Sequence, residues 1–235
     1  MRRFATAMTV GLAGTAAAAG TAHAQAISIT PAKACYLGGD AVSLSGSGFT
    51  PGGPVDVSID GTSLGQTAAD AAGNIAGEIR LGTMRGVKSH AMTATDQTNP
   101  ALIASVSYLG TTNRVSVRPQ NARAGTKRRL RGSGFLAGPR VYMHVRGPGG
   151  YRADKRIARA KAPCGTFAVR RQIVGSGASV GRYRVQFDAV RRYSKKTRPR
   201  LVGFMTVSLR AGSAVARPSL FGGAALAQRW TTFAG

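Results

Sequence analysis

Residues 42–60 read VSLSGSGFTPGGPVDVSID, and they carry two local signals. Val55, Val57 and Ile59 alternate with polar residues, which is the period of a β-strand with one buried and one solvated face. The Gly-Ser-Gly-Phe and Pro-Gly-Gly segments just before them are turn-forming, and no helical pattern follows. The stretch therefore predicts a strand-end turn leading into a half-buried strand.

The same pattern returns 86 residues later, where residues 129–146 read RLRGSGFLAGPRVYMHVR. Val55 matches Val141 at this offset, and the offset grows to 92 where Gly73 matches Gly165. The offset increases only between patterned runs, as expected when two copies of one fold diverge through insertions in loops. We infer an internal duplication.

Short alternating runs separated by Gly, Pro, Asn and Asp clusters continue through both copies, and neither contains an amphipathic helical pattern. About seven strands per copy predict an all-β fold of two tandem Ig-like antiparallel β-sandwiches. Domain one is expected over residues 27–110 and domain two over residues 114–210. Residues 211–235 are rich in Gly, Ala and Ser and are expected to form a flexible tail.

The first 24 residues predict a signal peptide. A short positive segment precedes the apolar residues 4–20, and Ala22-His23-Ala24 reads as a cleavage site. The mature chain is then expected to start at Gln25, to be secreted or held in the cell envelope, and to contain no membrane span. The alternative is that the same apolar stretch is a membrane anchor.

A family resemblance rests on the turn and core residues of the two copies. The pattern V-x-L-x-G-S-G-F-x-P-G-G-x-V-x-V-x-I-D-G, followed by D-A-A-G-N, resembles the tandem Ig-like (IPT/TIG-like) repeats of secreted actinobacterial proteins. It is also similar in style to neocarzinostatin-type sandwiches. The resemblance covers most of residues 27–210 and implies a fold and an extracytoplasmic location, but no known activity.

Charge is divided unequally between the two copies, although the whole chain has a net charge of +25. Residues 27–110 hold four basic and six acidic residues, whereas residues 111–210 hold 25 basic and two acidic residues. A charge asymmetry of this size indicates a partner of opposite charge for the second domain.

Two basic runs are the predicted polyanion-binding residues. Arginine pairs bidentately with phosphate and carboxylate groups, which suits such a surface. The alternative is a solvated face in a chain from an arginine-rich genome. The first run lies on the expected connection between the last two strands and contains Arg191, Arg192, Lys195, Lys196, Arg198 and Arg200. The second run contains Lys127, Arg128, Arg129 and Arg131.

The expected partners are anionic cell-envelope or extracellular polymers. An exported protein does not meet genomic nucleic acid, and the sequence lacks RNP, KH and zinc-finger signatures. Two alternatives stay open: a carrier of a small ligand of the neocarzinostatin type, and a structural spacer without a ligand. Salt-dependent retention on an anionic matrix separates the first reading from the other two.

Residues for catalysis are scarce, so the sequence predicts a non-enzymatic protein with no cofactor and no metal. Walker and HExxH motifs are missing from the sequence, and no GxSxG motif occurs in the strand–turn–helix context that a catalytic serine needs. His144 alternates with the core positions of its strand and is expected at the surface. Asp70 and Asn74 flank a turn but match no calcium-binding loop.

Cys35 and Cys164 are the two cysteines of the chain, and an oxidising compartment favours a disulfide. They occupy different positions in the two copies, so neither domain holds its own bridge. If domain one has seven strands, its last strand ends at the same end of the sandwich as its first strand. The connection that follows the first strand, which carries Cys35, lies at this end. Cys164 follows the fourth strand of domain two and lies at the top of that domain, which faces the same junction. The parity therefore predicts an interdomain Cys35–Cys164 disulfide. The alternatives are two free thiols and an intermolecular bridge.

Overall fold

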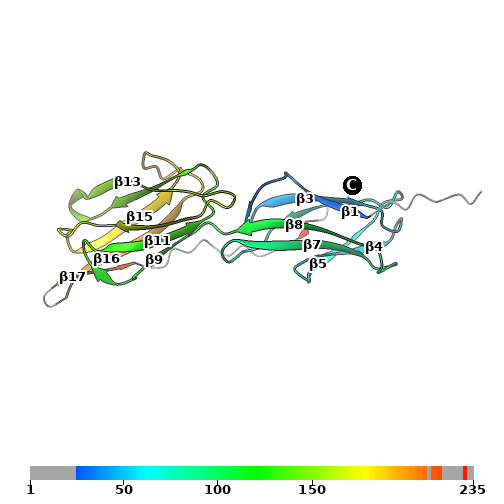
Figure 1. Ribbon diagram of the computed structural model, residues 1–235, viewed down its shortest axis with the longest axis horizontal. Helices are drawn as coiled ribbons and strands as arrows, with labels where there is room; N and C mark the ends of the chain where they lie inside the picture. Colours follow the sequence, from blue (N-terminus) through cyan, green and yellow to red (C-terminus); the bar gives the residue numbers. More distant parts are fainter. Residues whose placement is uncertain (1–24, 211–212, 219–229, 232–235) are drawn as a thin grey trace, which may run out of the picture.

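The computed structural model describes residues 25–210, 213–218 and 230–231, and it shows two β-sandwiches arranged end to end (Figure 1). Apart from one 3-10 turn, η1 (Pro148–Gly150), every described element is a strand, which confirms the predicted all-β class. In these ranges, no helix has the length and apolarity needed to cross a membrane. The expected signal peptide lies outside the described residues.

Domain one pairs a four-stranded sheet with a five-stranded one, and each includes one two-residue strand. The smaller sheet has the order β1 (Ala26–Thr30), β3 (Ala41–Ser47), β6 (Ile75–Arg80) and β18 (Trp230–Thr231). The larger sheet has the order β2 (Tyr36–Leu37), β8 (Ile103–Thr111), β7 (Lys88–Asp96), β4 (Pro54–Ile59) and β5 (Thr62–Ala68).

Domain two repeats this arrangement. Its smaller sheet has the order β14 (Phe167–Gln172), β11 (Lys127–Ser133) and β9 (Arg114–Arg118). Its larger sheet has the order β10 (Ala122–Arg123), β17 (Ser213–Pro218), β16 (Leu201–Arg210), β15 (Gly181–Asp188), β12 (Arg140–Arg146) and β13 (Arg152–Arg159).

Two described segments of residues 211–235 differ from the expected flexible tail. Strand β17 extends the larger sheet of domain two by pairing with β16, whose last residue is Arg210. Strand β18 (Trp230–Thr231) pairs with β6 of domain one. Composition does not reveal either pairing, because both are formed by the backbone. The other residues of this range lie outside the described part of the chain.

The two sandwiches have separate hydrophobic cores, and the duplicated alternating runs supply both. Val55 and Val57 of β4 are buried in the first core, and Val141 and Met143 of β12 occupy the matching positions in the second. Burial of these apolar faces is the main favourable term for each domain.

The duplication extends to one backbone contact that requires glycine. The Phe49 N–H donates to the Gly73 carbonyl at 3.1 Å, and the Phe135 N–H donates to the Gly165 carbonyl at 3.2 Å. A Cβ atom on Gly73 would lie 2.3 Å from the Phe49 carbonyl oxygen, and one on Gly165 would lie 2.4 Å from that of Phe135. Both glycines also have positive φ angles, so the two copies share one turn structure beside the Gly-Ser-Gly-Phe segment.

The domain junction is short and covalently linked. Cys35 and Cys164 form the predicted interdomain disulfide, with Cα atoms 5.2 Å apart and both residues buried. Two residues separate β8 from β9, and the Ser133 hydroxyl of domain two donates to the Thr112 carbonyl at 2.8 Å. A Cβ on Gly134 would approach the Asn113 Cα atom to 2.6 Å, so the domains are closely packed here.

Candidate functional site

The first basic run lies in the connection between β15 and β16, as the sequence predicts. We call residues 189–200 the basic loop. Five of its six cations are exposed, whereas Arg200 is half-buried. The loop returns over the outer side of the larger sheet: the Arg146 guanidinium carbon lies 4.3 Å from the ring centroid of Tyr193, and Gln186 donates to the Ser194 carbonyl at 2.9 Å. The loop is therefore attached to the sheet at several points.

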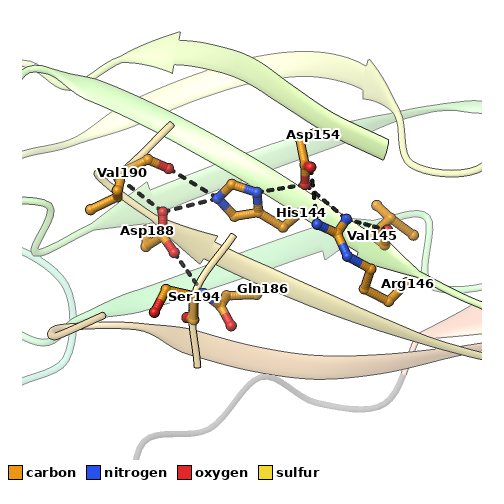
Figure 2. A network of polar contacts seen from close by, with 8 residues as sticks. All are labelled: His144, Val145, Arg146, Asp154, Gln186, Asp188, Val190 and Ser194. Carbon is orange, nitrogen blue, oxygen red and sulfur yellow. Dashed lines mark hydrogen bonds and ion pairs between the residues drawn. The ribbon is translucent and has the colours of Figure 1, made fainter. Parts of the chain in front are cut away.

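A polar network around the buried His144 and Asp188 holds the start of this loop (Figure 2). His144 on β12 donates from Nδ1 to Asp154 at 2.7 Å, and its Nε2 lies 3.2 Å from an Asp188 carboxylate oxygen and 3.0 Å from the Val190 carbonyl oxygen. The Val190 N–H donates to Asp188 at 2.9 Å. Arg146 completes the network by donating to Asp154 at 2.9 Å. The side chains thus connect three neighbouring strands to the loop.

The electrostatics of the network favour an imidazolium between two carboxylates. Burial opposes the charged form of His144, but hydrogen bonds to Asp188 and Asp154 outweigh it and raise the pKa of the imidazole. Burial likewise favours neutral Asp188, but hydrogen bonds from His144, Gln186 and the Val190 N–H lower the pKa of that carboxyl. The Arg146 hydrogen bond is the largest cause that lowers the pKa of Asp154.

The expectation that His144 is a surface residue is wrong, because its side chain is fully buried. The alternation placed it correctly on the outer side of its sheet. What it could not show is that the basic loop covers that side. The sequence reasoning also missed Asp154 and Asp188 as partners, although Asp188 matches Asp96 of the first copy.

The internal comparison shows which part of the network is particular to domain two. Asp96 is also buried and accepts backbone N–H groups from Thr50, Thr98 and Asn99. These hydrogen bonds outweigh the effect of burial and lower the pKa of Asp96 to about 2. At the 86-residue offset, the position of His144 is held by Ser58 in domain one. Both copies therefore have a buried aspartate at the end of the corresponding strand. Only in domain two does a histidine connect this aspartate to the loop that follows.

The second basic run is divided between the two sides of β11. Lys127, Arg129 and Arg131 are exposed, but Arg128 is buried and donates to the carbonyls of Pro119, Gln120 and Ala122. The assignment of Arg128 to the polyanion-binding residues is therefore wrong, since its guanidinium binds backbone inside the domain. Strand alternation contained the signal, because Arg128 shares the side of Leu130.

The outer side of the smaller sheet of domain two is a dense cationic surface, which we call the arginine face. Strand register places Arg129 of β11 between Arg118 of β9 and Arg170 of β14. None of the described ion pairs contains a cation of this face. Sequence reasoning missed three of its members because cross-strand neighbours cannot be read from local runs. The face comprises Arg114, Arg118, Lys127, Arg129, Arg131 and Arg170.

One end of the arginine face opens into a hollow of about 730 Å³ at the domain junction, which we call the junction hollow. Gly86 and Val87 of domain one form one side of it, and four arginines with several small polar residues form the other. The residues from domain two are Arg114, Ser116, Arg118, Arg129, Arg131, Gly132, Ser133 and Thr166.

The two predicted basic runs do not form one site, because they belong to opposite sheets of the same sandwich. Beside the basic loop is a second hollow, of about 550 Å³, lined by Arg146, Arg152, Arg191 and Arg192 together with Tyr193 and the acidic Asp154. The junction hollow has no acidic residue in its lining, so it is the more favourable place for an anion.

The described residues offer little for metal binding. No group of three His, Cys, Asp or Glu side chains among them is placed to hold a metal ion. The Asp70 carboxylate, which flanks a turn, accepts the N–H groups of Ala72 and Asn74 at 2.8 Å each. The Asp70 carboxylate therefore stabilises the turn through these hydrogen bonds.

No protein-family model and no curated protein matches the chain. Among solved structures, the human OSCAR ligand-binding domain is 14% identical and the match covers 76% of this chain and 93% of that one, with a TM-score of 0.27. The Clostridium thermocellum CbhA fibronectin(III)-like modules are 13% identical over 82% and 90%, with a TM-score of 0.26. A tetra-tandem repeat from the extending region of a large adhesion protein is 16% identical over 84% and 63%, with a TM-score of 0.26. The strand order defines this chain as an all-β protein of two tandem Ig-like sandwiches.

Proposed function

We propose that this protein is an exported, non-enzymatic binder of anionic cell-envelope or extracellular polymers, and that the arginine face of domain two is its main binding surface. The observation that supports this most directly is the row of Arg118, Arg129 and Arg170 across three adjacent strands. Like charges placed directly opposite one another destabilise a sheet. A polyanion would remove this cost by supplying the missing negative charge.

The chemistry of the face suits a charged polymer. Guanidinium groups pair bidentately with phosphate and carboxylate groups and are always charged. The exposed cations of the basic loop, on the opposite side of the domain, increase the long-range field that attracts a polyanion. Domain one has more acidic than basic residues, so it would project the basic domain without competing for the polymer.

The location outside the cytoplasm is part of the proposal. The interdomain disulfide is typical of proteins from oxidising compartments, and the first 24 residues have the pattern of a signal peptide. In that compartment the accessible polyanions are envelope and matrix polymers rather than genomic nucleic acid.

Salt-dependent retention on immobilised heparin and on isolated envelope polymer tests the proposal. We expect retention above about 0.2 M salt and a steep fall of log affinity with log salt, because counterions are released from the polyanion. A variant that carries Arg118→Gln, Arg129→Gln and Arg170→Gln should elute at clearly lower salt. Elution of the unmodified protein below about 0.2 M salt from every anionic matrix would contradict polyanion binding.

A further inference from the structure

We infer that the junction hollow is a composite site for phosphate groups, formed by both domains and held in shape by the disulfide. This inference rests on the proposed function and names the chemistry that the arginine face would recognise. The hollow of about 730 Å³ brings together Arg114, Arg118, Arg129 and Arg131. Within the described part of the chain, no carboxylate forms an ion pair with any of the four.

The number of guanidinium groups favours phosphate over an isolated carboxylate. A carboxylate has two oxygens and a charge of −1, and one guanidinium fork can pair with both oxygens. A terminal phosphate group presents three acceptor oxygens and a charge of up to about −2, so it can engage more forks at once. Four arginines around one hollow therefore match a terminal phosphate group better than a single carboxylate.

Two of the three hydroxyl groups in the hollow already donate to the backbone. Ser133 donates its proton to the Thr112 carbonyl at 2.8 Å, and Ser116 donates to the Arg131 carbonyl at 3.4 Å. With Thr166 as the third hydroxyl, the four arginine forks are the principal donors to an anion.

Domain one contributes a wall rather than charge. Val87 is 45% exposed, and with Gly86 it faces the arginines across the hollow. Such a wall limits access by water and lowers the local dielectric constant, which strengthens the pairing of an anion with guanidinium groups. The position of the wall depends on the junction, where the Cys35–Cys164 bond crosses between the domains.

Calorimetric titration of the disulfide-intact protein with tripolyphosphate, and with butane-1,2,3,4-tetracarboxylate as a carboxylate of comparable charge, tests the ligand class. We expect tripolyphosphate to bind at least about tenfold more tightly than the tetracarboxylate, and the Arg129→Gln/Arg131→Gln variant to lose at least about tenfold in tripolyphosphate affinity. The control Arg156→Gln/Arg159→Gln removes the same charge from β13 and should change affinity less than about threefold. Equal binding of the two probes would overturn the assignment to phosphate.

A second pair of variants tests whether the site needs both domains. Val87→Glu places a carboxylate opposite the arginines, and we expect it to weaken tripolyphosphate binding at least about tenfold. Ile103→Glu is its control, because Ile103 is 52% exposed in the same domain but starts β8, whose other end reaches the junction. Equal effects of the two variants would overturn the composite site. If retention on polyanions were nevertheless normal, the proposed function would stand without this site.

Discussion

Cys35 and Cys164 are 129 residues apart in sequence and join the two sandwiches where the chain passes from one to the other. The bond closes a loop that contains most of domain one and half of domain two. It therefore constrains the orientation of the domains, while each domain keeps its own core.

Removal of this bond should affect the junction more than either fold. For Cys35→Ser/Cys164→Ser we expect a loss of up to about 4–5 kcal/mol in the free energy of unfolding, because the unfolded chain regains the entropy of a long open loop. We also expect weaker tripolyphosphate binding. Calorimetry measures both effects, and small-angle scattering measures the change in domain orientation that we expect to accompany them. Unchanged domain orientation and unchanged binding would show that the junction is rigid without the disulfide.

The arginine face should be a stability cost as well as a binding surface. We expect Arg118→Gln/Arg129→Gln/Arg170→Gln to raise the free energy of unfolding at low salt by about 1 kcal/mol, because two like-charge cross-strand contacts are removed. The control Arg191→Gln/Arg192→Gln/Arg198→Gln removes three exposed loop charges and should leave that free energy nearly unchanged.

The same two variants should differ in polyanion binding. The slope of log affinity against log salt is negative, and we expect the face variant to make it less steep by roughly three units, about one for each lost contact. The loop variant should change the slope by less. Measurements at several salt concentrations check this. A larger effect of the loop variant would move the main binding surface to the basic loop.

The Asp188 carboxylate should be necessary for the position of the basic loop. Asp188→Asn removes the charge that pairs with His144 and accepts from Val190, and we expect a loss of about 3 kcal/mol in the free energy of unfolding. Trypsin should also cleave the variant faster between residues 191 and 200. Asp56→Asn is the control, because Asp56 is an acid on β4 that accepts a side-chain bond from Ser63. Equal cleavage of both variants would show that the network does not hold the loop.

The stability supplied by the network should have a defined pH window. The pKa of His144 is raised in the folded state, so its contribution is complete below about pH 6.5 and is lost as pH rises through the folded-state value. The pKa values of Asp154 and Asp188 are lowered, so their contribution is present above about pH 4 and is lost on acidification.

Thermal unfolding of the unmodified protein and of His144→Gln across this range tests the window. The difference in stability between them should be largest at about pH 5–6 and should decrease towards alkaline pH, because only the charged imidazole pairs with both carboxylates. A difference that does not change with pH would mean that His144 acts through packing alone.

Much of the architecture follows from local pattern. A strand turns successive side chains to opposite faces, so alternation identifies the core residues Val55 and Val141 without knowledge of the partner strands. The repeated Gly-Ser-Gly-Phe segment indicates the duplication together with the matches that follow it in the same order, such as Val55 with Val141 and Gly73 with Gly165. Strand count also places Cys35 and Cys164 at one junction, since an odd number of strands brings the chain to a known end of each sandwich.

Only the tertiary structure decides what lies over or beside those strands. His144 is buried because the basic loop returns over its sheet, and Arg129 lies between two other arginines because of the cross-strand register. Both depend on contacts between residues far apart in sequence, for which the alternation of one strand contains no information. The sequence alone thus determines two sandwiches, their cores and a basic second domain. The arrangement of the charges into a face and a hollow arises from packing between strands and between domains.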